Sequence, residues 1–143
     1  MEIFISKDGK CARKATDDPL TRPCTPRFHY HKYQNESITV IKGLMGYHMG
    51  DQSSVKIAKQ GETVTFPYNV PHTFWSLSAD KDVILRVRVS PALTSSTFYE
   101  NYIGIKRDVR NPIIRELNLL YAELESDIYP AGIPLTLSRF IHL

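Results

Sequence analysis

Four side chains in the first 72 residues could together hold one divalent metal ion. His29 and His31 are two residues apart, Glu36 follows five residues later, and His72 comes from a separate segment. Neutral imidazoles and a carboxylate suit transition metals such as iron, nickel, manganese, copper or zinc. A metal held in this way keeps open positions for a substrate or for water. If the four side chains converge, these residue types indicate a metal-dependent enzyme.

The spacing constrains the elements that must position these ligands. His29 and His31 would point to the same face of a strand, because side chains alternate along a strand. Glu36 is an odd number of residues further on, so a continuous strand could not aim it with the histidines. We therefore expect the polar residues 32–35 to interrupt the strand and reset its phase, and His72 to come from a separate strand.

The same alternation predicts which side chains surround the ligands. Ile38 and Val40 would share the face of Glu36, and Phe74 would share the face of His72. These three apolar residues are candidates for the wall of a substrate pocket. The alternative, that they are ordinary core residues, fits the pattern equally well.

Residues 1 to about 90 have the pattern of a β-sandwich or small barrel. Short runs rich in β-branched and aromatic residues are separated by Gly, Pro and Asp. The predicted strands cover residues 3–5, 37–41, 44–49, 55–58, 63–66, 73–75 and 83–89.

After Pro91 the pattern becomes helical. Thr97 and Glu100 have the spacing of a capping box, and Asn111-Pro112 is typical of a helix start. A helix over 112 to about 126 would be amphipathic, on the outside of the barrel or against a second subunit. Its apolar face would consist of Ile113, Ile114, Leu117, Leu120, Tyr121 and Leu124. Pro130, Gly132 and Pro134 predict a linker after it.

The ligand spacing resembles the two motifs of the cupin superfamily. The first motif is present as His29-x-His31-x4-Glu36-x6-Gly43, with Pro23 at the usual leading glycine. The second is present as Gly61-x5-Pro67-x-Asn69-x2-His72-x3-Ser76, with Asn69 in place of a glycine and Ser76 in place of an asparagine. These departures fall at turn positions and not at ligands. Asparagine also tolerates the left-handed backbone that glycine adopts.

The resemblance, to a single-domain metal-binding cupin of the quercetin-dioxygenase-like type, implies a fold and a set of roles. The fold is an all-β cupin jelly-roll β-barrel over residues 1–91, with the motifs at 29–43 and 61–76. Residues 92–143 would be a helical extension of the same domain, packed outside the barrel. The resemblance assigns His29, His31, Glu36 and His72 as metal ligands. In related dioxygenases the glutamate can also leave the metal and act as a base, which would make Glu36 catalytic.

Three functions are compatible with such a site. The leading hypothesis is a dioxygenase-type oxidoreductase acting on a small apolar or aromatic, oxygen-bearing metabolite. The second is a non-redox, metal-assisted isomerase, decarboxylase or cyclase in which Glu36 or a metal-bound water moves a proton. The third is a non-catalytic, small-molecule-binding cupin, against which the complete ligand set argues.

Composition excludes several other classes of protein. The chain has 143 residues, which suits one domain, and a formal net charge of +3 without a dense basic stripe, so a nucleic-acid partner is not expected. The sequence has no membrane-length apolar run and no signal peptide pattern, so we expect no membrane partner and a cytoplasmic location. Free thiols are then expected at Cys11 and Cys24. A homodimer would cover the sheet edges and the apolar helix.

Other candidate residues are better explained without a site role. His48 lies in a predicted strand and His142 in the tail, so neither is expected to be a fifth ligand. Arg86 and Arg88 alternate with apolar residues and are expected on a solvated face, although one of them could anchor a substrate carboxylate. The tyrosines at 99, 102 and 121 are expected to be packing residues on helices.

Overall fold

The computed structural model of the protein describes residues 1–9, 11–12, 18–22, 24–93 and 97–132. Strands precede two helices, as predicted, and one short strand follows them. The elements in chain order are β1 (Glu2–Ile5), the 3-10 turn η1 (Pro19–Thr21), β2 (His29–His31), β3 (Asn35–Lys42), β4 (Leu44–Met49), β5 (Asp51–Lys59), β6 (Thr63–Phe66), β7 (His72–Ser76), β8 (Val83–Ser90), α1 (Phe98–Asp108), α2 (Pro112–Glu125) and β9 (Ile128–Pro130).

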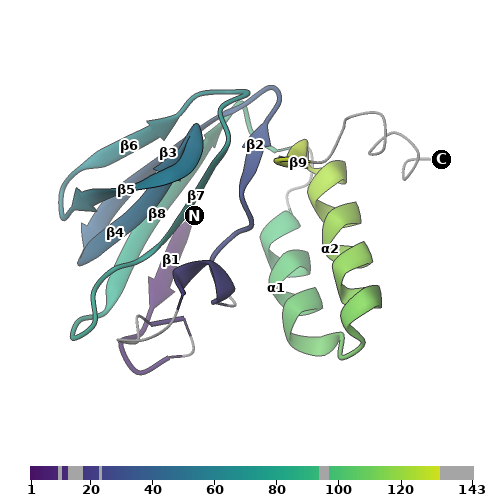
Figure 1. Cartoon of the computed structure of the whole chain (residues 1–143), viewed down its shortest axis with the longest axis horizontal. Coiled ribbons are helices and arrows are strands. Elements are labelled where there is room, and N and C mark those ends of the chain that lie inside the picture. The colour runs from purple at the N-terminus through teal and green to yellow at the C-terminus, as the bar shows by residue number, and fades with distance from the viewer. Residues whose placement is uncertain (10, 13–17, 23, 94–96, 133–143) are drawn as a thin grey trace.

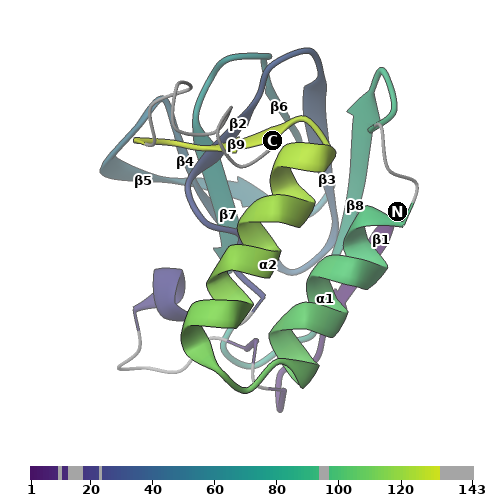
Figure 2. The ribbon, with the colours of Figure 1, turned by 90° about the vertical axis from the view of Figure 1, so that its right-hand side faces the viewer.

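The strands form two antiparallel sheets that face each other. One sheet has the strand order β1-β8-β3-β6 and the other β5-β4-β7-β2-β9. Consecutive strands such as β2 and β3 therefore lie in different sheets. The helices α1 and α2 stand as a pair beside the sandwich (Figure 1), and a view from that side shows both in front of the strands (Figure 2). The predicted jelly-roll with C-terminal helices outside it is confirmed.

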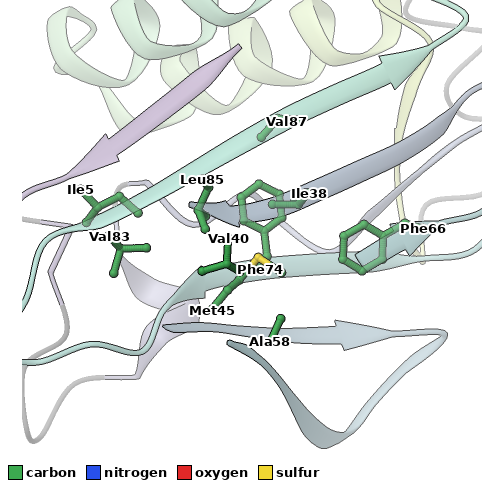
Figure 3. Packing of buried hydrophobic residues seen from close by; sticks show 10 residues of the cluster. All are labelled: Ile5, Ile38, Val40, Met45, Ala58, Phe66, Phe74, Val83, Leu85 and Val87. Carbon is green, nitrogen blue, oxygen red and sulfur yellow. The ribbon is translucent and has the colours of Figure 1, made fainter. Parts of the chain in front are cut away.

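Apolar side chains fill one part of the space between the sheets. The strand β3 shows how alternation places them, because Ile38 and Val40 are buried while Ser37 and Thr39, which alternate with them, are half-exposed. Burying one such aliphatic side chain contributes about 1.5–3 kcal/mol. The buried cluster consists of Ile5, Ile38, Val40, Met45, Ala58, Phe66, Phe74, Val83, Leu85 and Val87 (Figure 3).

The two helices begin differently. The Asn111 side chain accepts hydrogen bonds from the backbone N–H groups of Ile113 and Ile114, so the predicted start of α2 is confirmed. The Thr97 side chain makes no capping hydrogen bond at the start of α1 and instead accepts one from the Asn101 side chain at 3.3 Å, so the predicted capping box is not formed. No helix in the described part of the chain is both long and apolar enough to cross a membrane.

The buried face of α2 is not the predicted one. Leu119, Glu123 and Leu124 are its buried residues, whereas four of the six predicted apolar positions are exposed. Those four are Ile113, Ile114, Leu117 and Tyr121. Periodicity located the helix correctly but not the side on which the sheet and α1 contact it. The exposed apolar stripe is where the predicted second subunit would pack, and the dimer stays a prediction.

The linker predicted around Pro130 is partly a strand, which corrects the sequence analysis. β9 is the last strand of its sheet and pairs with β2, so His31 lies opposite Ile128 and His29 opposite Pro130. Proline lacks a backbone donor, and an edge strand is where a sheet tolerates it. The predicted Pro134 lies outside the described residues. The C-terminal extension thus contributes a strand beside the predicted ligands.

The prediction of free thiols is wrong. Cys11 and Cys24 form a disulfide with a Cα–Cα distance of 5.4 Å, within the normal range for such a bridge. The two cysteines are 13 residues apart, and nothing in that spacing distinguishes a bridge from two separate thiols. The half-buried Cys11 also packs against the apolar cluster.

Candidate metal centre

The two histidines of β2 point into the space between the sheets. Both are buried, while Tyr30 between them is half-buried. His29 is the register partner of His72 on β7. Directly opposed residues of antiparallel strands lie on the same face, and the ring centroids of His29 and His72 are 4.5 Å apart. Strand pairing therefore brings the two halves of the sequence motif together.

Glu36 reaches the histidines from the opposite sheet. β2 ends at His31 and β3 begins at Asn35, so the predicted interruption also moves the chain from one sheet to the other. The N–H of Tyr68 donates to the Asn35 side chain at 2.9 Å, and the N–H of Asn69 donates to the His31 carbonyl at 2.7 Å. Asn69 has a φ of 61°, the left-handed conformation expected at this glycine-like motif position.

The four predicted ligands converge on one point. The Glu36 carboxylate oxygen Oε2 lies 2.8 Å from His72 Nε2, 3.1 Å from His31 Nε2 and 3.9 Å from His29 Nε2. All four residues are buried, and one ligand atom from each lies within 4.8 Å of the others. Among the described residues this is the group of histidine, cysteine and acidic side chains that could hold a metal.

The other ring nitrogens determine what the centre can bind. His29 Nδ1 lies 2.8 Å from the Arg27 carbonyl oxygen, and His72 Nδ1 lies 2.9 Å from the Val70 carbonyl oxygen. A carbonyl only accepts, so both Nδ1 atoms donate to their carbonyl, and each ring turns its Nε2 toward Glu36. His31 Nε2 and His72 Nε2 lie at hydrogen-bond distance from Glu36 Oε2, and a bound metal ion would take the place of the protons between them. Backbone carbonyls that orient histidines in this way are the usual support of metal-binding imidazoles.

The centre holds an ionised carboxylate. Burial alone would raise the pKa of Glu36, but the imidazoles of His29, His31 and His72 outweigh it and hold that pKa well below the ordinary value. An anionic oxygen and three imidazole nitrogens fit a divalent transition metal. The donor set and the orientation of the rings therefore both agree with the predicted group.

An apolar layer borders the centre on the core side. The Phe66 ring stacks on His72 with centroids 4.2 Å apart and an interplanar angle of 5°. The predicted pocket residues belong to the same apolar cluster, since Ile38 and Val40 have no exposed surface and Phe74 is 7% exposed. Their role in substrate binding stays a prediction.

Two residues near the centre were missed by sequence reasoning. Burial and the charge of Glu36 raise the pKa of Tyr99, which places this phenol of α1 within electrostatic reach of the centre. Burial raises the pKa of Glu123 on α2, while Arg27 and His29 lower it. Helical periodicity carried one signal for Glu123, because it lies four residues after the buried Leu119.

The remaining candidates lie elsewhere in the structure. His48 is buried but hydrogen-bonds through Nδ1 to the Ser54 carbonyl at 2.9 Å and lies against Trp75, outside the ligand group. His142 lies outside the described residues. Arg86 and Arg88 are exposed, as predicted, and Arg86 pairs with Glu2 on the neighbouring strand β1.

The family comparison agrees with the fold and the centre. The family model described as "Cupin domain" matches residues 23–87, which include all four candidate ligands. Together with the two-sheet architecture, this match supports the predicted cupin superfamily. No curated protein matches the chain.

Solved structures that resemble part of the chain come from several organisms. TT1209 from Thermus thermophilus is 19% identical, with 47% of this chain and 61% of that chain covered and a TM-score of 0.42. The cupin domain of CENP-C from Drosophila melanogaster is 11% identical, with coverages of 46% and 52% and a TM-score of 0.41. KdgF from Halomonas sp. is 19% identical, with coverages of 48% and 59% and a TM-score of 0.38. The chain thus matches less than two thirds of the length of each of these structures.

Proposed function

We propose that the chain is a metal-dependent cupin enzyme. One divalent transition metal, from among iron, nickel, manganese, copper and zinc, would be held by His29, His31, Glu36 and His72. The observation that carries the proposal is the orientation of the rings. At least two imidazoles are fixed by backbone carbonyls so that their Nε2 atoms face one ionised carboxylate oxygen. A buried carboxylate needs a positive or hydrogen-bonding partner, and a metal ion held by the three Nε2 atoms would supply one.

We further propose a dioxygenase-type oxidoreductase of the quercetin-dioxygenase-like type. When bound, the metal would supply a Lewis acid and a redox centre with positions left open for substrate. The chain would supply the rest of the site. Phe66 stacked on His72, with Ile38 and Phe74 in the same cluster, offers an apolar wall that suits a small aromatic or otherwise apolar metabolite.

Glu36 would have a second role as a base. Its carboxylate is ionised, buried and surrounded by imidazoles. A substrate hydroxyl beside the open positions would find this oxygen as its nearest acceptor. Removing the hydroxyl proton would leave an electron-rich substrate, and the three histidines would keep the metal in place while Glu36 moves.

A second function is favoured by Tyr99. This phenol lies within electrostatic reach of Glu36, and both burial and the Glu36 charge raise its pKa and keep it protonated. Glu36 as a base, with the protonated Tyr99 phenol as a hydrogen-bond donor to the substrate, could move a proton between two substrate atoms without oxidation. The corresponding activity would be a metal-assisted isomerase, decarboxylase or cyclase.

Metal analysis of variants tests the centre. Wild type purified without added metal should contain about one metal ion per chain, and His31→Ala should lose most of it. His48→Ala is the matched control, because His48 is also a buried strand histidine but lies outside the ligand group. Absence of metal from the wild type under several growth conditions, or equal metal loss in both variants, would contradict the proposed centre.

Oxygen consumption separates the two reactions. Wild type would be supplied with a panel of phenolic and carboxylic substrates in air and under nitrogen. Uptake of oxygen that depends on substrate and is lost in Glu36→Gln supports the dioxygenase. Turnover that continues under nitrogen and is reduced in Tyr99→Phe supports the non-redox reaction.

A further inference from the structure

The segment that leads into β2 is held from several sides. The Thr73 hydroxyl donates to the Pro26 carbonyl at 2.6 Å, and the Ala131 N–H donates to the Phe28 carbonyl at 2.9 Å. Between these residues, the Arg27 carbonyl accepts the His29 Nδ1–H at 2.8 Å. The Arg27 backbone is therefore the group that sets the orientation of the His29 ring.

The Arg27 side chain binds two carboxylates of α2. Its Nε lies 3.0 Å from Glu123 Oε1, and its Nη2 lies 3.0 Å from Glu116 Oε2. The two partners differ in burial, because the Glu123 side chain is 3% exposed and the Glu116 side chain is 57% exposed. A solvated ion pair contributes little, whereas a buried one fixes geometry strongly and is costly to break. Arg27 hydrogen-bonds to Glu116, whereas its contact with Glu123 is an ion pair without hydrogen-bond geometry. Burial makes the Glu123 pair the costlier of the two to break.

Burying the Glu123 carboxylate costs free energy. It is 2% exposed, and its Oε2 has no hydrogen-bond partner. Leaving a buried polar atom unpaired costs about 1–3 kcal/mol. An apolar side chain at this position would pack against the sheet without that cost. Tyr102 and Lys106 of α1 also interact with this carboxylate, and Arg27 links it to the segment that leads into β2.

The strand β2, which carries His29 and His31, gives a reason for the buried carboxylate. α2 is tied to this strand twice, through the Glu123–Arg27 pair and through β9, which follows α2 and pairs with β2. We propose that Glu123 is a positioning residue of the metal centre. By restraining Arg27, it fixes the carbonyl that keeps the His29 Nε2 aimed at the metal. This inference rests on the proposed metal centre and gives the helical extension a part in it.

Cobalt substitution tests the inference directly. The metal-free protein would be titrated with Co²⁺, with affinity taken from competition with a chelator and geometry from the visible absorption bands. Glu123→Gln should weaken binding by about 10–100-fold, as loss of an outer partner of a metal ligand usually does, and should change the bands. Glu116→Gln is the matched control and should bind within about twofold of wild type, as expected for a solvated pair.

A second variant covers the case in which Glu123→Gln does not fold. Arg27→Lys keeps the backbone carbonyl and the charge at a partly exposed side chain, but it lacks the planar guanidinium. Arg27→Lys should also weaken Co²⁺ binding, but by less than Glu123→Gln does. Unchanged Co²⁺ affinity and bands in either folded variant would overturn the inference, even if thermal stability fell. Failure of the wild type itself to bind Co²⁺ would instead contradict the proposed metal centre.

Discussion

The space between the two sheets has an apolar half and a polar half, and the same strands contribute to both. On β3 the inward-facing Glu36 belongs to the polar half, and Ile38 belongs to the apolar half. On β7 the fully buried His72 and the nearly buried Phe74 divide in the same way. Phe66 lies at the boundary, at one end of the apolar cluster (Figure 3) and stacked on His72.

The two halves have opposite effects on the free energy of unfolding. Burial of aliphatic and aromatic side chains is the main favourable contribution to folding. Burial of a carboxylate with three imidazoles carries a desolvation penalty, and replacing such a group with apolar residues is often neutral or stabilising. This difference in free energy indicates that the apolar half stabilises the sandwich. The polar half is then retained because it binds a ligand or a metal ion.

The largest effect should follow from changing the carboxylate of the polar half. Glu36→Gln removes the anionic ligand and keeps the size of the side chain. Metal affinity should fall by more than the roughly 10–100-fold typical of losing an outer partner. Isothermal titration of the metal-free protein with Co²⁺ or Ni²⁺ would measure the loss. Affinity within tenfold of wild type would mean that Glu36 is not a ligand.

A substitution in the apolar half should do the reverse. Leu85 on β8 is fully buried in the cluster. Leu85→Ala should lower the free energy of unfolding by about 2–5 kcal/mol because it leaves a cavity, and it should leave metal affinity within about twofold. Urea denaturation and metal titration of the same preparation measure both quantities. Loss of metal binding in a folded Leu85→Ala protein would show that the halves are not independent.

Local patterns in the sequence were sufficient to predict most residues of the polar half. The His29-x-His31 spacing, the odd offset of Glu36 and the glycine-like Asn69 each reflect strand alternation or turn geometry. These features act over a few residues. The structure places the four candidate ligands together, and it adds that Glu36 comes from the opposite sheet.

Long-range contacts were not predictable in the same way. Arg27 and Glu123 meet because α2 packs beside the segment that leads into β2, and neither residue has a local feature that points to the other. The strand β9 was read as a linker because Pro130 is unfavourable inside a sheet but tolerated at its edge. The disulfide depends on Cys11 and Cys24 meeting in the folded chain. In each case the contact depends on the tertiary fold, and the spacing of residues in the sequence does not reveal it.

The disulfide should affect stability without affecting the centre. Cys11 packs against the apolar cluster and is joined to Cys24 across 13 residues. Removing a bridge over a loop of this size should lower the free energy of unfolding by about 2–3 kcal/mol. A Cys11→Ser/Cys24→Ser protein, compared with wild type by urea denaturation, measures the change. Unaltered metal affinity in that variant would confirm that the bridge serves the apolar half.

The smallest expected effect concerns the second buried carboxylate, Glu123, whose pKa is shifted opposite to that of Glu36. Burial raises the pKa of Glu123 above its ordinary value of 4.5. The folded protein then holds this proton more tightly than the unfolded chain does, so the stabilising contribution is full below the unfolded pKa. It is lost as the pH rises through the folded pKa.

Glu123→Gln should therefore show a smaller fall in Tm than wild type as the pH is raised from about 4, the region of an unfolded glutamate. Calorimetry on the metal-free proteins, with Glu116→Gln as the exposed control, would measure this difference in slope. Parallel curves for wild type and Glu123→Gln would show that Arg27 compensates the buried charge fully. Burial of the Glu123 carboxylate would then carry no net free-energy cost relative to a solvated carboxylate. The ion pair with Arg27 would be sufficient to explain why Glu123 is buried.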